Sequence, residues 1–441
     1  MDELLSRSAT HTAQALKDGH LSCAELTARL LDRIAAVDTK VNAIAELDAD
    51  GAMRRAHAAD QAIADGSPLG PLHGVPITIK DCFDAEGLHT TWGNPAFATH
   101  RATADATLVA RLKQAGANVI GKTNTAFMLA DVAQSANDLH GATANPWDLT
   151  RTPGGSSGGA AAALAAGLSF LDYGSDLAGS IRIPAALCGV YGLKPSTGLV
   201  SLHGFQPPGT PASTSDHRYL SAAGPLARTA GDLRVALQAT AGPDGPAALA
   251  YRWHLPPPRH TRLGHFRVGF VLDDPFAPPT AEVGASLRAL LDHLAAQGAT
   301  LVEGWPSRLD PAASYAAFGA QLEAFFAFAE GADLAGYPAQ ELARHAARQA
   351  WQDHFTRVDV FVCPSSYTAA FPPGDLPHPH LPFWGAHASL AGLPSLAAPI
   401  GRTDGGLPVG AQIIAPLYED DTVITFAELL AAGSSPATAQ P

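Results

Sequence analysis

Polar and apolar positions in the first 66 residues alternate with the period of amphipathic helices. Leu26 opens a run of apolar residues at helical spacing. Ser22 is followed three residues later by Glu25, a capping-box pattern that marks the start of a helix. We therefore expect residues 1–66 to form a helical segment that packs on the rest of the protein.

From Pro71 onward the pattern changes to short apolar runs separated by helical stretches. Val75–Ile79 and Ala117–Ile120 are typical of buried strands, and Asp105–Gln114 between them has a helical pattern. The alternation returns in the middle of the chain, where a strand, a helix and a strand are predicted in turn at Phe266–Leu272, Thr280–Ala296 and Ala299–Glu303. Strands that alternate with helices favour an α/β fold.

The composition is that of a globular protein, with 46% hydrophobic and 16% charged residues. The formal net charge of −13 argues against a nucleic-acid partner, because phosphate binding needs a basic surface. The N-terminal residues lack the basic and apolar regions of a secretory signal, and the apolar stretch 158–170 is too short to span a bilayer. The four cysteines have no metal-ligand or disulfide spacing. We expect a cytoplasmic protein that does not bind membranes.

Two serines and one lysine stand where the backbone is expected to bend. Ser156 lies in the glycine–serine loop GGSSGG, and Ser180 lies in a second glycine-flanked turn. Lys80 ends the apolar run Val75–Ile79 in a chain that has only six lysines. Amide hydrolysis needs a nucleophile, a proton carrier and donors for the developing oxyanion. These residues are therefore candidates for a serine nucleophile that is activated without histidine.

Lys80 can accept a proton only when it is neutral, which requires a lowered pKa. The apolar residues that precede it would bury its side chain and disfavour the ammonium form. Asp81 would oppose this shift, but alternation along a strand should direct its side chain to the other face. If Lys80 does not reach Ser180, the Ser156 hydroxyl could relay the proton, since a hydroxyl both donates and accepts.

The chain resembles the amidase signature family of Ser-Ser-Lys amidohydrolases over nearly its whole length. The similar segments are GVPITIKD at 74–81, GKTNT at 121–125, NPWDLTRTPGG at 145–155, GGSSGG at 154–159, GSDLAGSIR at 174–182 and GGLPVGAQ at 405–412. The resemblance implies that Ser180 is the nucleophile, Ser156 the bridging serine and Lys80 the base. It also implies a cis peptide bond before Ser156.

By the same resemblance, the oxyanion hole would be formed by the backbone of Leu177, Ala178 and Gly179. Ala178 stands where glycine is common in the family, and alanine tolerates positive φ less well than glycine. Asp176 and Arg182 flank the serine loop, and we expect them to form a structural ion pair.

The family fold is a large, mostly parallel twisted sheet surrounded by helices. We expect one domain over residues 1–432, because the similar segments lie on both sides of the proline-rich stretch 255–258. The small, polar residues 433–441 are predicted to be a disordered tail. The implied function is hydrolysis of a small-molecule carboxylic amide to acid and ammonia or amine through an acyl-serine intermediate. No metal or organic cofactor is implied, and a homodimer is left open.

Two other functions compete with this prediction. The amidase subunit of a tRNA-dependent amidotransferase would need partner chains and tRNA, and Ile183 stands where that subunit usually carries glutamine. A non-catalytic binding protein on the same scaffold is the alternative from another class, and the intact serines and lysine argue against it. Ser157 fits the G-x-S-x-G elbow of α/β-hydrolases, but residues 148–153 before it make a poor strand.

Two further features leave alternatives open. Asp131 follows residues that line the acyl pocket in the family, so it would attract an amine-bearing substrate or serve as a surface or capping aspartate. His378, His380 and His387 lie close in sequence and would bind a metal or belong to an exposed proline-rich loop. We expect the loop and no metal site.

Overall fold

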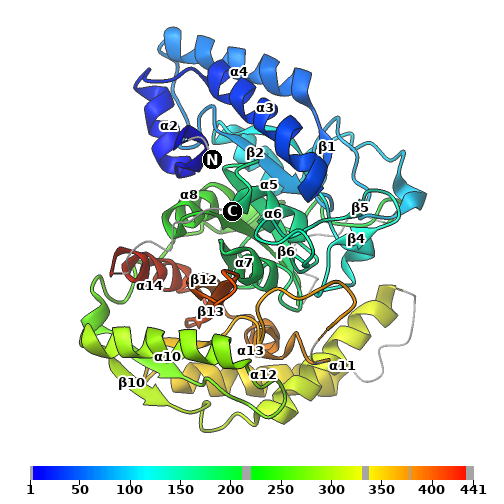
Figure 1. Cartoon of the computed structure of the whole chain (residues 1–441). Helices are drawn as coiled ribbons and strands as arrows, with labels where there is room; N and C mark the ends of the chain where they lie inside the picture. The colour runs from blue at the N-terminus through cyan, green and yellow to red at the C-terminus, as the bar shows by residue number, and fades with distance from the viewer. Residues whose placement is uncertain (1–2, 211–219, 330–336, 377–378, 434–441) are drawn as a thin grey trace.

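The computed structural model describes residues 3–210, 220–329, 337–376 and 379–433 of the chain. It confirms an α/β fold in which helices surround a large sheet (Figure 1). Among the described residues this sheet has eight strands, in the order β10-β9-β11-β13-β12-β7-β8-β6. The strands are β6 Leu171–Asp176, β7 Tyr191–Lys194, β8 Ala222–Ala227, β9 Arg267–Phe270, β10 Thr300–Glu303, β11 Val360–Pro364, β12 Ser395–Arg402 and β13 Pro408–Ile414.

Strand pairing in the large sheet is mixed, which corrects the expectation of a mostly parallel sheet. β9 pairs in parallel with β10 and β11, whereas the other five neighbouring pairs are antiparallel. Strands joined through a helix still share one direction, since β6 and β7 both run antiparallel to β8 between them. The antiparallel pairs arise because β8 inserts between these strands and because β12 and β13 form a hairpin, which needs no crossover helix.

A small sheet continues the large one beyond β6. Its strands are β1 Ile44–Leu47, β2 Pro76–Lys80 and β3 Asn118–Thr123, in the order β1-β3-β2. The Phe170 N–H donates to the Pro76 carbonyl at 3.4 Å, and the Thr78 N–H donates to Ser169 Oγ at 3.1 Å. Both predicted strands are confirmed, and Lys80 at the end of β2 comes to lie beside β6.

The N-terminal segment is helical, with one interruption. Its helices are α1 Glu3–Ser6, α2 Ala9–Lys17, α3 Cys23–Val41 and α4 Ala49–Ala64. Ser22 caps α3 as predicted, because its Oγ accepts the Glu25 N–H at 3.0 Å. The strand β1 between α3 and α4 was not expected. It pairs with β3, far along the chain, so local periodicity does not reveal it.

The remaining helices pack around the two sheets. They are α5 Thr107–Gln114, α6 Gly158–Ala165, α7 Arg182–Cys188, α8 Ala230–Thr240, α9 Ala247–Ala250, α10 Ala281–Ala296, α11 Pro311–Ala329, α12 Tyr337–His354, α13 Phe383–Ala391 and α14 Asp420–Gly433. The predicted strand–helix–strand unit in the middle of the chain is confirmed as β9, α10 and β10. Gly433 ends α14, and the rest of the predicted tail lies outside the described residues.

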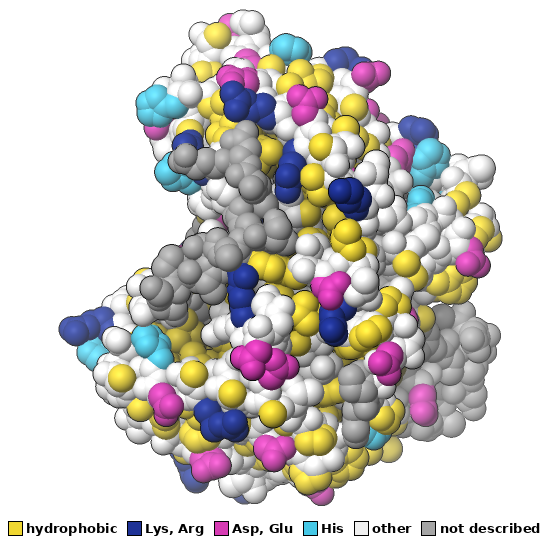
Figure 2. All heavy atoms as spheres, in the orientation of Figure 1, with side chains coloured by type: hydrophobic (Ala, Val, Ile, Leu, Met, Phe, Trp, Pro, Cys, Tyr) yellow, Lys and Arg dark blue, Asp and Glu magenta, His cyan; other side chains and the backbone are white. Residues whose placement is uncertain are grey.

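The surface carries charges of both signs. On the face seen in Figure 2, basic and acidic side chains lie interspersed with apolar ones. In the described part of the chain, every helix is too short or too polar to cross a membrane.

Helix α6 is built from small residues because it lies in a crowded place. Its eight residues, GGAAAALA, are all buried. A Cβ on Gly159 would lie 2.4 Å from the Asn124 carbonyl oxygen, so only glycine lets the helix approach the segment after β3 this closely. This approach brings the start of α6 next to the end of β2.

We predict that Gly159→Ala lowers the free energy of unfolding by about 1–3 kcal/mol, because the added methyl group overpacks against backbone atoms that cannot move away. Gly319 in α11 is the matched control, since a Cβ there meets nothing within 4 Å. Gly319→Ala should stabilise the protein by roughly 0.5–1 kcal/mol. Urea unfolding measures both, and equal effects of the two variants would contradict this account of the packing.

Candidate active site

Lys80 lies at the carboxyl end of β2 and is 0% exposed. Its Nζ donates to three serine hydroxyls, Ser156 Oγ at 2.7 Å, Ser157 Oγ at 2.9 Å and Ser175 Oγ at 3.0 Å. The predicted pair of Lys80 and Ser156 is therefore in direct contact. Ser157 and Ser175 are members of this cluster that the sequence analysis did not assign to Lys80, although both lie in segments that it singled out.

Burial lowers the pKa of Lys80 to about 8, against the opposing effects of Cys82, Asp176 and Asp172. The cause is the one expected from the apolar strand, since a low-dielectric environment disfavours the charged ammonium. Hydroxyl dipoles replace water around the nitrogen without adding a full negative charge. The site can therefore hold a lysine that is neutral in mildly alkaline solution.

The loop that carries Ser156 is held by backbone contacts. The peptide bond between Gly155 and Ser156 is cis, as the resemblance implies. The Gly155 N–H donates to the Val132 carbonyl at 2.9 Å, and Thr125 Oγ1 donates to the Ser156 carbonyl at 2.7 Å. Residues 146–157 are all described and contain no strand, so the α/β-hydrolase elbow lacks the strand it requires before Ser157.

Ser180 lies in the loop between β6 and α7, and its carbonyl accepts the Ser157 N–H at 3.1 Å. The two serine loops are therefore directly bonded through the backbone. Ser180 is 4% exposed, whereas Ser156 is 0% exposed. Of the two serines that the sequence analysis named, Ser180 is the one that retains some access from outside.

Asp176 and Arg182 form the structural ion pair expected from the sequence. Arg182 Nη2 lies 2.8 Å from Asp176 Oδ1, and both side chains are buried. Burial acts to raise the pKa of Asp176, but the charge and hydrogen bonds of Arg182 outweigh it and bring this pKa to about 2. Asp176 also accepts the N–H groups of Gly179 at 2.9 Å and Ile181 at 3.1 Å. The pair thus fixes both ends of the Ser180 turn.

Arg182 also joins this turn to the C-terminal part of the chain. Its Nη1 donates to Gln412 Oε1 at 2.6 Å, and its Nη2 donates to Ser389 Oγ at 2.8 Å. Gln412 belongs to β13, in the GGLPVGAQ segment that resembles the family. This contact explains how a segment far away in sequence contributes to the site.

The three expected oxyanion-hole residues differ in their backbone bonding. Gly179 adopts a φ of 108° and donates its N–H to Asp176, so this donor is already engaged. Ala178 is not among the residues with positive φ, so the alanine is not strained there. Among the described residues, no acceptor is assigned to the N–H groups of Leu177 and Ala178.

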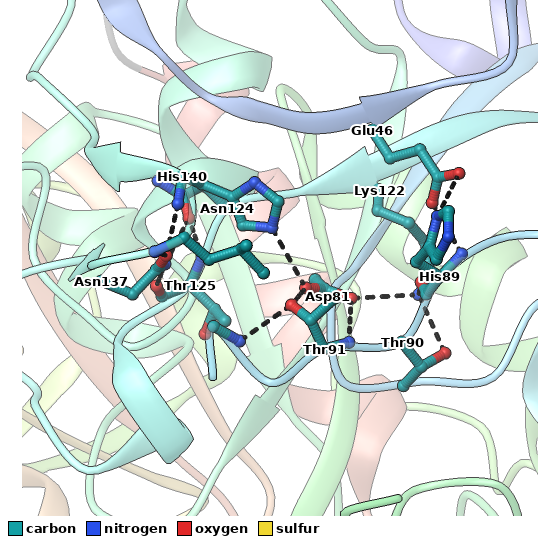
Figure 3. A network of polar contacts seen from close by, with 12 residues as sticks. Glu46, Asp81, His89, Thr90, Thr91, Lys122, Asn124, Thr125, Asn137 and His140 are labelled. Atoms are coloured by element: carbon teal, nitrogen blue, oxygen red, sulfur yellow. Dashed lines mark hydrogen bonds and ion pairs between the residues drawn. The ribbon is translucent and has the colours of Figure 1, made fainter. Parts of the chain in front are cut away.

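Asp81 points away from Lys80, as strand alternation predicts (Figure 3). Its carboxylate accepts the Thr91 N–H at 2.9 Å and lies 3.5 Å from Lys122 Nζ. His140 Nε2 lies 3.9 Å from the other carboxylate oxygen. Asp81 is therefore balanced by a separate polar network on the opposite side of β2, so its charge is directed away from the serine cluster.

The other two open features are placed as follows. Asp131 is exposed, and its Oδ1 accepts the Ala133 N–H at 2.7 Å, which is the geometry of a capping aspartate. His387 is buried in α13 and hydrogen-bonds Ser314 through Nδ1, while His378 lies outside the described residues. Within the described ranges no three His, Cys, Asp or Glu side chains are placed to hold a metal ion.

Comparison with known proteins identifies the family. The chain belongs to the Amidase family, whose model matches residues 25–335 and 324–424. A relative from Roseiflexus sp. (strain RS-1), named as a glutamyl-tRNA(Gln) amidotransferase subunit, is 34% identical over 467 residues that cover 94% of each chain. The resemblance noted in the sequence is thereby confirmed.

Two solved structures share the fold over nearly the full length of both chains. One is described as a vestigial protein complex that reveals the evolutionary origins of an s-triazine catabolic enzyme. It is 29% identical, with a TM-score of 0.83, and covers 98% of this chain and 99% of that chain. The other is the peptide amidase PAM in complex with the competitive inhibitor chymostatin. It is 28% identical, with a TM-score of 0.79, and covers 98% of this chain and 99% of that chain.

We predict that Asp176→Asn lowers the free energy of unfolding by about 3–5 kcal/mol, because it leaves the buried Arg182 guanidinium without its counter-charge. Asp353→Asn is the control, since Asp353 pairs with Arg308 at 3.2 Å on the surface. That variant should change stability by no more than about 0.5 kcal/mol. Chemical unfolding at neutral pH measures both, and a loss at Asp176 as small as at Asp353 would refute the structural role of the pair.

Proposed function

We propose that this protein hydrolyses carboxylic amides through an acyl-enzyme on Ser180, with Ser156 as the proton relay and Lys80 as the base. The observation that carries the proposal is the hydrogen bond of 2.7 Å between Ser156 Oγ and a fully buried Lys80 Nζ. A lysine whose pKa burial lowers to about 8 is neutral often enough to accept a proton under mild conditions.

In the first step, neutral Lys80 takes the Ser156 hydroxyl proton while Ser156 takes the proton of Ser180. The Ser180 oxygen then bonds to the amide carbonyl carbon, and the N–H groups of Leu177 and Ala178 are the donors for the oxyanion. The C–N bond breaks as the proton returns through Ser156 to the leaving nitrogen. Water, activated by the same relay, adds to the acyl carbon and releases the acid and Ser180.

A second function shares this chemistry but places it in an assembly. The relative from Roseiflexus is named as a subunit of a glutamyl-tRNA(Gln) amidotransferase, and the relative from Salinispora arenicola carries the same name at 34% identity over 99% of both chains. These relatives favour the amidotransferase subunit over the stand-alone amidase. In that role the protein would work with partner chains and tRNA, against the expectation from its net charge.

Ile183 bears on this choice. Its side chain is buried and lies directly below Gly179, because a Cβ on Gly179 would lie 2.7 Å from Ile183 Cδ1. An apolar side chain at this point offers no hydrogen bond to a polar substrate. Ammonia release from a panel of aliphatic, aryl and amino-acid amides by the purified single chain separates the two functions. Turnover without partners supports the stand-alone amidase, and turnover only with partner chains supports the amidotransferase role.

We predict that Ser180→Ala lowers amide turnover by about 10⁶-fold, because it removes the atom that forms the acyl bond. A fluorophosphonate probe followed by peptide mass spectrometry should label Ser180 in the unsubstituted protein. Ser286→Ala, a change in a serine of α10, should leave both readouts unchanged. Labelling at Ser157 instead of Ser180 would refute the nucleophile assignment and favour the hydrolase elbow.

The rate should rise with pH along a limb centred near pH 8, because below the lowered pKa of Lys80 its ammonium cannot accept a proton. Lys80→Arg should remove the limb and at least about 100-fold of the rate, since guanidinium stays protonated. Lys113→Arg, at a lysine that pairs with Asp105 away from the serine cluster, is the matched control. Near-normal turnover in Lys80→Arg would show that Lys80 acts only as a positive charge.

A further inference from the structure

Asp172 is a fully buried carboxylic acid on β6 that the proposed reaction does not use. Its Oδ2 accepts Thr78 Oγ1 at 2.5 Å and Thr123 Oγ1 at 3.1 Å. Its Oδ1 has no hydrogen-bond partner among the described residues. A buried carboxyl with one unbonded oxygen costs folding free energy, so its presence calls for a compensating interaction.

The groups that bind Asp172 connect it to the base. Thr78 lies two residues before Lys80 on β2. Lys80 in turn donates to Ser175, three residues after Asp172 on β6. The two charged groups thus lie along the same contact between β2 and β6, where water is excluded. In such surroundings each charge affects the protonation of the other.

The other ionisable groups around Lys80 are neutral or already compensated. Burial raises the pKa of Cys82 to about 12, so its thiol is uncharged where the enzyme would work. Asp176 is paired with Arg182. On β3, Lys122 donates to the His89 carbonyl and faces Asp81 on the opposite side of β2. Asp172 is thus the anionic group near Lys80 that has no other cation beside it among the described residues.

We propose that Asp172 is a positioning residue of the active site, whose buried carboxylate is the counter-charge that governs the protonation of Lys80. This inference rests on the proposed amide hydrolysis, in which neutral Lys80 is the base. Its effect is to oppose the burial of Lys80, which alone would make the lysine a weaker base. Asp172 thereby keeps the base strong while the serine hydroxyls keep it accessible to the relay.

The order of titration follows from the two environments. Burial raises the pKa of Asp172 from its ordinary 3.8 to about 7, against the hydrogen bonds of Thr78 and Thr123 and the charge of Lys80. Burial lowers the pKa of Lys80 to about 8. As the pH rises, Asp172 therefore ionises first and then stabilises the Lys80 ammonium until that group also loses its proton.

The pH profile of amide turnover tests this role. In Asp172→Asn the alkaline limb should move to lower pH by roughly one unit, and the plateau rate should fall because the base is weaker. Thr78→Val, which removes one donor to the carboxylate, should move the limb in the same direction by less. Asp420→Asn is the matched control, since Asp420 is equally buried and bonds Ser196 elsewhere. Limbs of Asp172→Asn and Thr78→Val that coincide with the unsubstituted limb would overturn the proposal.

A double-mutant cycle provides a readout that does not depend on catalysis. Unfolding free energies are measured for Asp172→Asn, Lys80→Met and the double variant. The coupling should be favourable at pH 7.5, where both groups are charged, and smaller at pH 5, where Asp172 is protonated. Zero coupling at both pH values would overturn the role of Asp172. If the protein hydrolyses no amide, the proposed function fails, and this cycle alone decides on Asp172.

Discussion

A lysine without access to water must lose its charge, pair with an anion or be surrounded by dipoles. Lys80 is 0% exposed, and three serine hydroxyls within 3.0 Å bind its Nζ. A carboxylate in direct contact would stabilise the ammonium and abolish the base. The hydroxyls satisfy the nitrogen in either protonation state, so the rest of the site depends on this choice of partners.

The fold brings these partners together from three places. β2 supplies the lysine, the cis-bonded turn before α6 supplies two of the hydroxyls, and β6 supplies the third. Glycine at the start of α6 permits its close approach to the segment after β3. The buried pair of Asp176 and Arg182 then fixes the turn that carries Ser180 and ties it to β13. Charge is thus used to hold the backbone, while neutral dipoles hold the base.

Much of this could be predicted from the sequence, because the signals are local. The capping pattern at Ser22, the apolar strand before Lys80 and the glycine-flanked serines each declare their local structure within a few residues. Ser156 could be linked to Lys80 only through the resemblance to a family, since no short-range pattern connects residues so far apart. The roles assigned to the serines remain predictions, whereas their contact with the lysine is observed.

Non-local pairing explains what the sequence did not reveal. β1 became a strand through its pairing with β3, and β8 inserted as an antiparallel neighbour between two strands linked by a helix. Asp172 reads as one polar residue in an apolar run, and its relation to Lys80 appears only when β6 lies beside β2. These features depend on which elements meet in space, and periodicity carries no such information.

The protonation of Lys80 can be measured directly, because the chain has only six lysines. NMR of protein labelled with ¹³C at the lysine ε-carbons gives a separate titration for each, and Lys80→Met assigns the signal. The account predicts a transition near pH 8, well below the ~10.4 of an exposed lysine. A Lys80 signal that titrates near 10.4 would contradict it, because the ammonium would then persist and no base would be available to the serines.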